Sequence, residues 1–110
     1  MIHNTLNRLE MRIADATGVP KEKRSELLKL IAKLRTELQA ISKHDPENAE
    51  TIASFAHLTA HEKLKKKTNP KLVQTSESGL EESLVDFRAS NPQLAAIIDD
   101  ILNVLSASGI

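Results

Sequence analysis

Apolar residues at alternating spacings of four and three constrain this chain most, because that rhythm places them on one side of an α-helix. One set runs through residues 2–16 and a second through residues 27–41. Their members are Ile2, Leu6, Leu9, Ile13 and Ala16, then Leu27, Ile31, Leu34, Leu38 and Ile41. The pattern predicts two amphipathic helices.

The segment Gly18-Val19-Pro20 separates these two helices. Gly18 is expected to take a left-handed conformation after the first helix, with Val19 folding back onto the last turn and Pro20 stopping the helix. Because the loop is short, the helices are predicted to pack as an antiparallel hairpin over residues 1–43.

The segment Asp45-Pro46-Glu47 predicts the start of a third helix, over residues 44–66. Asp caps free backbone N–H groups, Pro suits the first helical position, and Glu favours the positive helix end. Half of the residues on the apolar face are alanines; the face consists of Ala49, Ile52, Phe55, Ala56, Ala60 and Leu64. We therefore expect a marginal helix that buries little area.

Residues 67–77 show no sustained period, and Pro70 forbids a helix that runs through them without a break, so they are predicted to form a linker. The run Ser78-Gly79-Leu80-Glu81 has the form of a capping box, which predicts a short helix from there. Ser90-Asn91-Pro92 ends that helix and caps the next, so residues 78–110 are expected to form a short acidic hairpin.

The last helix is predicted to be the most buried. Its stripe is Leu94, Ile98, Ile101 and Leu105, and Ile97, Leu102 and Val104 broaden it. Gly109 and Ile110 are expected to close it as a Schellman cap, rather than to serve as a C-terminal peptide for a partner.

Together these segments predict a single all-α domain in which antiparallel helical hairpins form a small bundle of about five helices. The chain has 110 residues, with two Phe and neither Trp nor Tyr. Its core must therefore consist of Leu, Ile, Val and Ala, which suits helices better than a sandwich or barrel. The heptad runs are too short for an extended coiled coil.

The C-terminal segment resembles a known family. The run Leu80, Phe87, Arg88, Pro92, Leu94, Leu105 and the terminal Gly109-Ile110 is similar to the tail of a bacterial domain-of-unknown-function family, the one numbered 4404. The hairpin around Gly18-Val19-Pro20 resembles the longer members. The resemblance implies a short cytoplasmic helical protein with no assigned activity, so no site residue carries over. Asn91 stands where the family has a His before the Pro, which keeps a helix cap and removes any role of that His.

Composition limits the expected cellular location of the protein and the kinds of charged partner it can bind. The chain has no Cys, which excludes disulfides and thiolate metal sites. No signal peptide is apparent, and the apolar run 94–98 is too short to cross a membrane, so a cytoplasmic protein is expected. The formal net charge is zero, but residues 1–43 carry nine basic and five acidic residues, whereas residues 76–110 carry one and six. These two segments have opposite sign and are expected to pair.

His57 and His61 lie four residues apart, so a helix would place both imidazoles on one face, where they could ligate a metal ion. A catalytic zinc usually has three protein ligands, and Glu62 is not placed as in the H-E-x-x-H motif. We therefore interpret the pair as solvated and expect neither a metal site nor a cofactor.

The densest run of like charge consists of Lys63, Lys65, Lys66, Lys67 and Lys71. Two interpretations stay open: a solvated helix end, which cations favour, or a surface that binds nucleic acid or another polyanion through residues 63–71. No aromatic side chain interleaves these lysines to stack on bases, which favours the first interpretation.

No catalytic signature is present, and the carboxylates of the C-terminal segment suit helix ends and surfaces. The leading hypothesis is a non-enzymatic helical interaction or scaffold protein, with a second copy or a helical protein as its partner. The apolar flanks of two helices exceed the cover that one chain is expected to offer, so a homodimer is expected through Leu28, Leu30, Ile97, Leu102 and Val104.

Overall fold

The computed structural model describes residues 1–108, and these form six helices and no strand. The helices are α1 (Ile2–Ala14), α2 (Lys21–Ser42), α3 (Pro46–Lys63), α4 (Pro70–Leu84), the short α5 (Phe87–Ser90) and α6 (Pro92–Ala107). The predicted all-α bundle is confirmed. No helix in these residues is both long and apolar enough to span a membrane.

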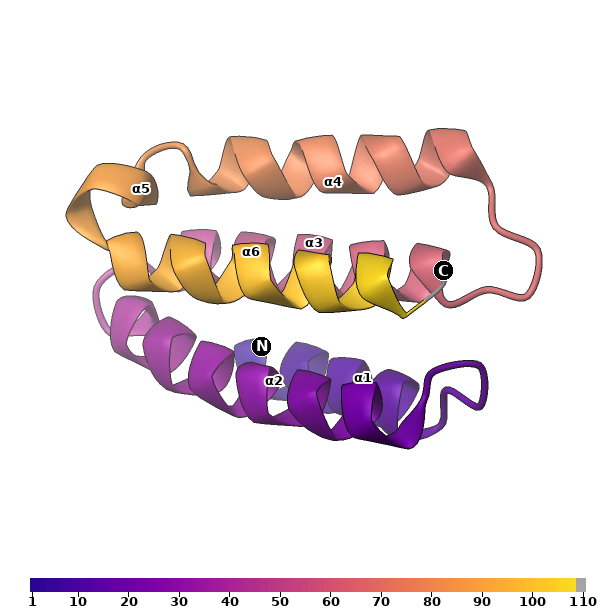
Figure 1. The fold of residues 1–110 in the computed structure, drawn as a ribbon. Coiled ribbons are helices and arrows are strands. Elements are labelled where there is room, and N and C mark those ends of the chain that lie inside the picture. The colour runs from indigo at the N-terminus through magenta and orange to yellow at the C-terminus, as the bar shows by residue number, and fades with distance from the viewer. Residues whose placement is uncertain (109–110) are drawn as a thin grey trace.

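The helices stack in three layers, which Figure 1 shows from the side. The α1–α2 hairpin forms one layer, α3 and α6 form the middle layer, and α4 is the outermost helix (Figure 1). Helix α3 contacts α1, α2, α4 and α6, whereas the main packing partner of α4 is α3. The layered arrangement leaves α4 attached chiefly through one helix.

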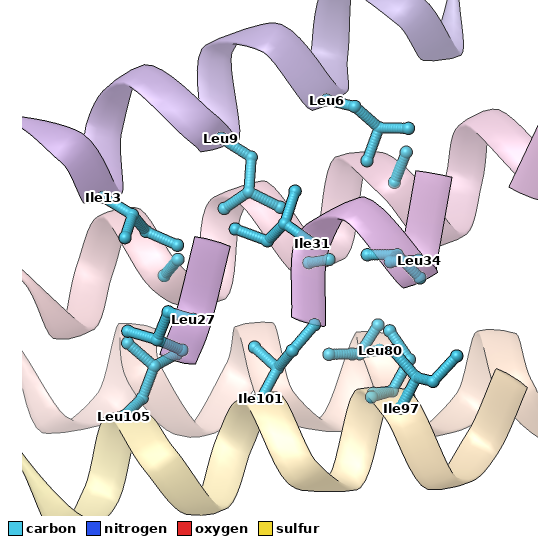
Figure 2. Packing of buried hydrophobic residues seen from close by; sticks show 14 of the residues in the cluster. Leu6, Leu9, Ile13, Leu27, Ile31, Leu34, Leu80, Ile97, Ile101 and Leu105 are labelled. Atoms are coloured by element: carbon cyan, nitrogen blue, oxygen red, sulfur yellow. The ribbon is translucent and has the colours of Figure 1, made fainter. Parts of the chain in front are cut away.

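A single hydrophobic cluster joins the layers (Figure 2). Leu6, Leu9 and Ile13 of α1 meet Leu27, Ile31 and Leu34 of α2, and Ile97, Ile101 and Leu105 of α6 lie below them (Figure 2). Full burial of one such side chain contributes about 1.5–3 kcal/mol to folding. The stripes that predicted the first two helices and the last one are therefore the core of the molecule.

Three helices begin in the same way, with a polar cap followed by proline. The Asp45 carboxylate accepts a hydrogen bond from the Asn48 N–H at 3.2 Å, and the Asn91 side chain accepts one from the Leu94 N–H at 3.1 Å. Both starts were predicted. The third is Asn69, whose Oδ1 accepts from the backbone N–H groups of Lys71 and Leu72 at 3.1 and 3.3 Å.

The cap at Asn69 makes the predicted linker over residues 67–77 wrong. Pro70 is the first residue of α4 rather than a helix breaker, because the missing N–H of proline costs nothing at that position. The expected capping box at Ser78 is also wrong, since Ser78 and Glu81 lie inside α4.

The end of α1 differs from the prediction too. Gly18 does not have a left-handed φ, and the helix stops at Ala14. The chain reverses through two successive turns, in which the Ala16 N–H donates to the Ile13 carbonyl and the Val19 N–H to the Ala16 carbonyl. Val19 is buried, as expected of a residue that folds back onto the hairpin.

Helix α3 is central rather than marginal, and it ends at Lys63 instead of Lys66. Its small residues let neighbouring helices approach closely, which compensates for the small area each one buries. Gly79 of α4 marks a close approach to α3: a Cβ built there would lie 2.2 Å from Phe55 Cε1.

Helix α6 contributes seven buried apolar residues, more than any other described helix, as its wide stripe predicted. The expected cap at Gly109 and Ile110 lies outside the described residues.

Candidate functional site

A groove with a volume of about 710 Å³ follows one side of α4 along its whole length. Residues of α4 line it at helical spacing, and four residues from outside the helix complete it. The lining comprises Lys63, Thr68, Pro70, Val73, Gln74, Glu77, Ser78, Glu81, Glu82, Val85 and Arg88. It thus combines apolar side chains with three carboxylates and two basic groups.

Lys63 links α4 to α6 at one end of the groove. Its Nζ lies 3.3 Å from Oε1 of Glu77 in α4 and donates to Oγ of Ser106 in α6 at 3.1 Å. The Lys63 side chain is only 10% exposed, which limits competition from water. This residue therefore holds the two helices together.

Arg88 makes the equivalent link at the other end. Its guanidinium pairs with Glu81 of α4 and, at 3.4 Å, with Asp99 of α6. The hydrogen bonds that the guanidinium donates to Asp99 and Glu81 raise the pKa of Arg88 above its usual value. Because this pair is exposed, it contributes little to stability and mainly fixes where the side chains lie.

The surface beside the groove carries excess negative charge. Glu77 and Glu81 are paired with Lys63 and Arg88, whereas exposed Glu82 is in no ion pair among the described residues. The neighbouring Asp86 and Asp100 are exposed as well. Asp99 and Asp100 point to different surroundings, as expected of adjacent helical residues, since Asp99 meets Arg88.

A second cleft, of about 610 Å³, lies where the α1–α2 loop meets the α3–α4 loop. Four basic residues line it, Arg12, Lys63, Lys65 and Lys66, against one carboxylate, Asp15. Backbone and small side chains of Ala16, Thr17, Gly18, Val19, Leu64 and Thr68 complete the wall.

The predicted lysine run does not form one surface. Lys63 is buried in its link to Glu77, and Lys65 pairs at 2.9 Å with Glu62, whose side chain is 7% exposed. Lys66, Lys67 and Lys71 are exposed. The sequence did not indicate the burial of Lys63, because its partners lie 14 and 43 residues further along the chain.

The predicted histidine pair does share one face of α3. The ring centroids of His57 and His61 are 6.1 Å apart, and His61 Nδ1 accepts a hydrogen bond from Arg12 Nε at 3.4 Å. Burial lowers the pKa of His57, and the nearby His61, Arg8 and Arg12 lower it further. Among residues 1–108, no three His, Cys, Asp or Glu side chains gather in a way that would hold a metal ion.

Two of the five residues predicted to mediate self-association lie in the chain's own core, and three lie at its edge. Ile97 and Val104 are 6% and 8% exposed. Leu28, Leu30 and Leu102 are partly buried and pack against the cluster. Three of the five thus keep some exposed apolar surface, and self-association through them stays a prediction.

Comparison with known proteins gives one match. A family model described as "Domain of unknown function (DUF4404)" matches residues 2–110. No curated protein and no solved structure matches the chain significantly.

Proposed function

The chain belongs to the DUF4404 family, a domain of unknown function, and on that premise we propose that it is a non-enzymatic interaction protein that binds a basic amphipathic helix of a partner protein along α4. The observation that carries this proposal is the groove that extends from Thr68 to Arg88, in which three carboxylates outnumber two basic groups.

The length of the groove suits a helical partner. Helix α4 has 15 residues, which at about 1.5 Å per residue gives about 22 Å, or four helical turns. Helix-in-groove recognition uses apolar anchors at helical spacing together with charges at the rim. Val73 and Val85 offer apolar contacts here, and Val85 is 58% exposed.

The charge of the groove determines which sign of charge is favoured on the partner helix. Glu82 lines it and is in no ion pair among the described residues, and Asp86, next to the lining residue Val85, adds negative charge. Complementary potentials speed association and reject partners of the wrong sign. An acidic helix would face these carboxylates, so a basic one is favoured.

The ionised groups of the groove support a role in binding rather than catalysis. Glu77 and Glu81 are engaged by Lys63 and Arg88, and these bridges hold α4 against α6. Carboxylates engaged in these bridges serve to position α4 rather than to act on a bound molecule.

A titration with two synthetic peptides tests the proposal. Each is about 14 residues long, four helical turns, with leucine along one face and either lysine or glutamate on the other. We expect saturable binding of the lysine peptide, detected by fluorescence anisotropy, and none of the glutamate peptide.

Two variants locate the binding. Glu82→Lys should weaken binding of the lysine peptide about fivefold, the effect of about 1 kcal/mol from exposed charges. Glu22→Lys, which reverses an exposed carboxylate at the start of α2, is the matched control and should leave binding unchanged. Equal binding of both peptides, or equal loss in both variants, would contradict the proposal.

A further inference from the structure

A second surface, next to the α4 groove, gathers basic groups along the edge between α1 and α3. Arg8 and Arg12 of α1 lie near His57 and His61 of α3, and all the charged neighbours that shift the pKa of His57 are basic. Neighbours of one sign repel one another, and a bound anion would relieve that repulsion.

This edge continues into the basic cleft through Arg12. Its Nε donates to His61 Nδ1, while the residue also lines the cleft beside Lys66. Lys63 and Lys65 line the cleft too, but their charges are matched by Glu77 and Glu62. Arg12 and Lys66 are in no ion pair among the described residues, so they supply the uncompensated positive charge of the cleft.

We propose that this cleft binds a small phosphate-bearing ligand, with Arg12 and Lys66 as the groups that contact the phosphate. The volume of about 610 Å³ lies within the range of about 300–1,000 Å³ that small-molecule sites occupy. Arg suits a phosphate because its guanidinium donates two parallel hydrogen bonds, and Lys adds a point charge.

Asp15 is the one carboxylate that lines the cleft, and it opposes an anionic ligand. It is exposed, and its side chain makes no hydrogen bond within the described residues. Asp15→Asn therefore removes a repulsive charge and should tighten binding. Damage to the fold would not produce a tighter complex, so this variant separates recognition from stability.

The histidines couple binding to protonation. A phosphate near Arg12 would favour the charged form of His57, so ligand binding would raise the pKa of His57. Arg8, Arg12 and His61 all oppose protonation in the free protein, and the anion counters them. Affinity should therefore increase as pH falls through the range in which His57 gains its proton.

Inorganic pyrophosphate is the probe, and isothermal titration calorimetry with the full chain at low salt is the measurement. We expect saturable binding that weakens about tenfold in Arg12→Gln and in Lys66→Gln, and tightens about threefold in Asp15→Asn. Lys33→Gln, at an exposed position on α2, should match the wild type. Lys66→Gln and Asp15→Asn change exposed residues, so the test holds even where Arg12→Gln lowers stability.

Three results would overturn the proposal: no saturable binding of pyrophosphate, equal weakening in Lys33→Gln, or no tightening in Asp15→Asn. A duplex DNA arm tests a macromolecular source of phosphate. Retention on DNA that the same variants abolish and that pyrophosphate does not compete would assign the surface to nucleic acid instead.

The histidine signals give an independent readout. In NMR spectra recorded across a range of pH, the ring resonance of His57 should titrate at higher pH in the presence of pyrophosphate than in its absence. An unchanged titration would contradict the coupling between the cleft and the histidine pair.

Discussion

At the scale of single residues, Lys63 shows how a charged side chain becomes part of a helical core. It is 8% exposed, yet its ammonium is held by the Glu77 carboxylate and the Ser106 hydroxyl. Burying an ion is costly unless a partner and further hydrogen bonds accompany it. Both conditions are met here, because α4 and α6 each bring one polar group to the end of α3.

The first prediction concerns this link. Lys63→Met keeps the length of the side chain but removes the ammonium, leaving Glu77 without its partner, and should lower the free energy of unfolding by about 1–2 kcal/mol. Lys66→Met, three residues on and exposed, should change it by less than about 0.5 kcal/mol. Urea unfolding measures both, and equal effects would mean that the link contributes nothing.

His57 makes stability depend on pH. Its pKa in the folded protein lies below the ordinary value of 6.5, so between the two values the unfolded chain binds more protons than the folded one. The free energy of unfolding should therefore decrease as pH falls below about 6.5, through the pKa that His57 has in the folded state.

The matching measurement compares urea unfolding across pH 5–8 for two variants, a range of about three units around the histidine value. His57→Gln should flatten the decrease at low pH, whereas His44→Gln, exposed between α2 and α3, should leave it unchanged. A wild-type free energy of unfolding that increases as pH falls would contradict this prediction.

At the scale of elements, α4 depends on a close approach to α3. A Cβ at position 79 would overlap the Phe55 ring, with a separation of 2.2 Å from Cε1. Ala in place of Gly gains about 1 kcal/mol of helix propensity, but overpacking costs about 1–3 kcal/mol. The two effects oppose each other, and the contact distance favours the second.

Gly79→Ala should therefore destabilise the protein by about 1 kcal/mol, and Phe55→Leu combined with it should recover part of that loss. A double-mutant cycle by urea unfolding measures the coupling. A Gly79→Ala protein that is more stable than the wild type would show that the ring moves away freely and that propensity decides.

The sequence predicted those elements whose signals are local. The starts at Asp45 and Asn91 depend on one side chain and the backbone three residues on, and both predictions were correct. A proline such as Pro70 breaks a helix when it lies inside it but is favourable as the first residue of a helix. Only the Asn69 cap before it distinguishes the two cases here. The capping residue Asn69 is visible in the sequence, but the absence of an apolar stripe in residues 67–77 favours the prediction of a linker.

The site was harder to predict because it depends on long-range packing. The alanine-rich face of α3 suggests weak burial. Small residues nevertheless pack well when helices come close, and α4 comes close to α3 where Gly79 faces the Phe55 ring. The sequence predicts the lysine run as one surface. In the structure Lys63 and Lys65 form ion pairs with carboxylates, whereas Lys66 is exposed. No local pattern specifies that Glu77 and Ser106 reach Lys63.

At the scale of the whole molecule, α4 is an outer helix joined to α6 by the Lys63 and Arg88 bridges (Figure 1). The groove between these bridges is the surface proposed for a basic helix. Its lining residues come mainly from one face of α4, so occupation of the groove would bury that face without unfolding the core.

The oligomeric state is a prediction at the same scale. If the groove serves a different protein, sedimentation at micromolar concentration should give a mass near 12.1 kDa throughout. A mass that rises with concentration toward twice this value would support the homodimer expected from the sequence, with a second copy as the occupant.

The most direct test of the α4 groove is a map of backbone amide shifts in the nitrogen-15-labelled protein during titration with the lysine–leucine peptide. The account predicts that the shifts concentrate at residues 68–88 and Lys63, with little change around the α2–α3 loop. Shifts spread evenly over the molecule, or centred on the α1–α2 hairpin, would contradict it.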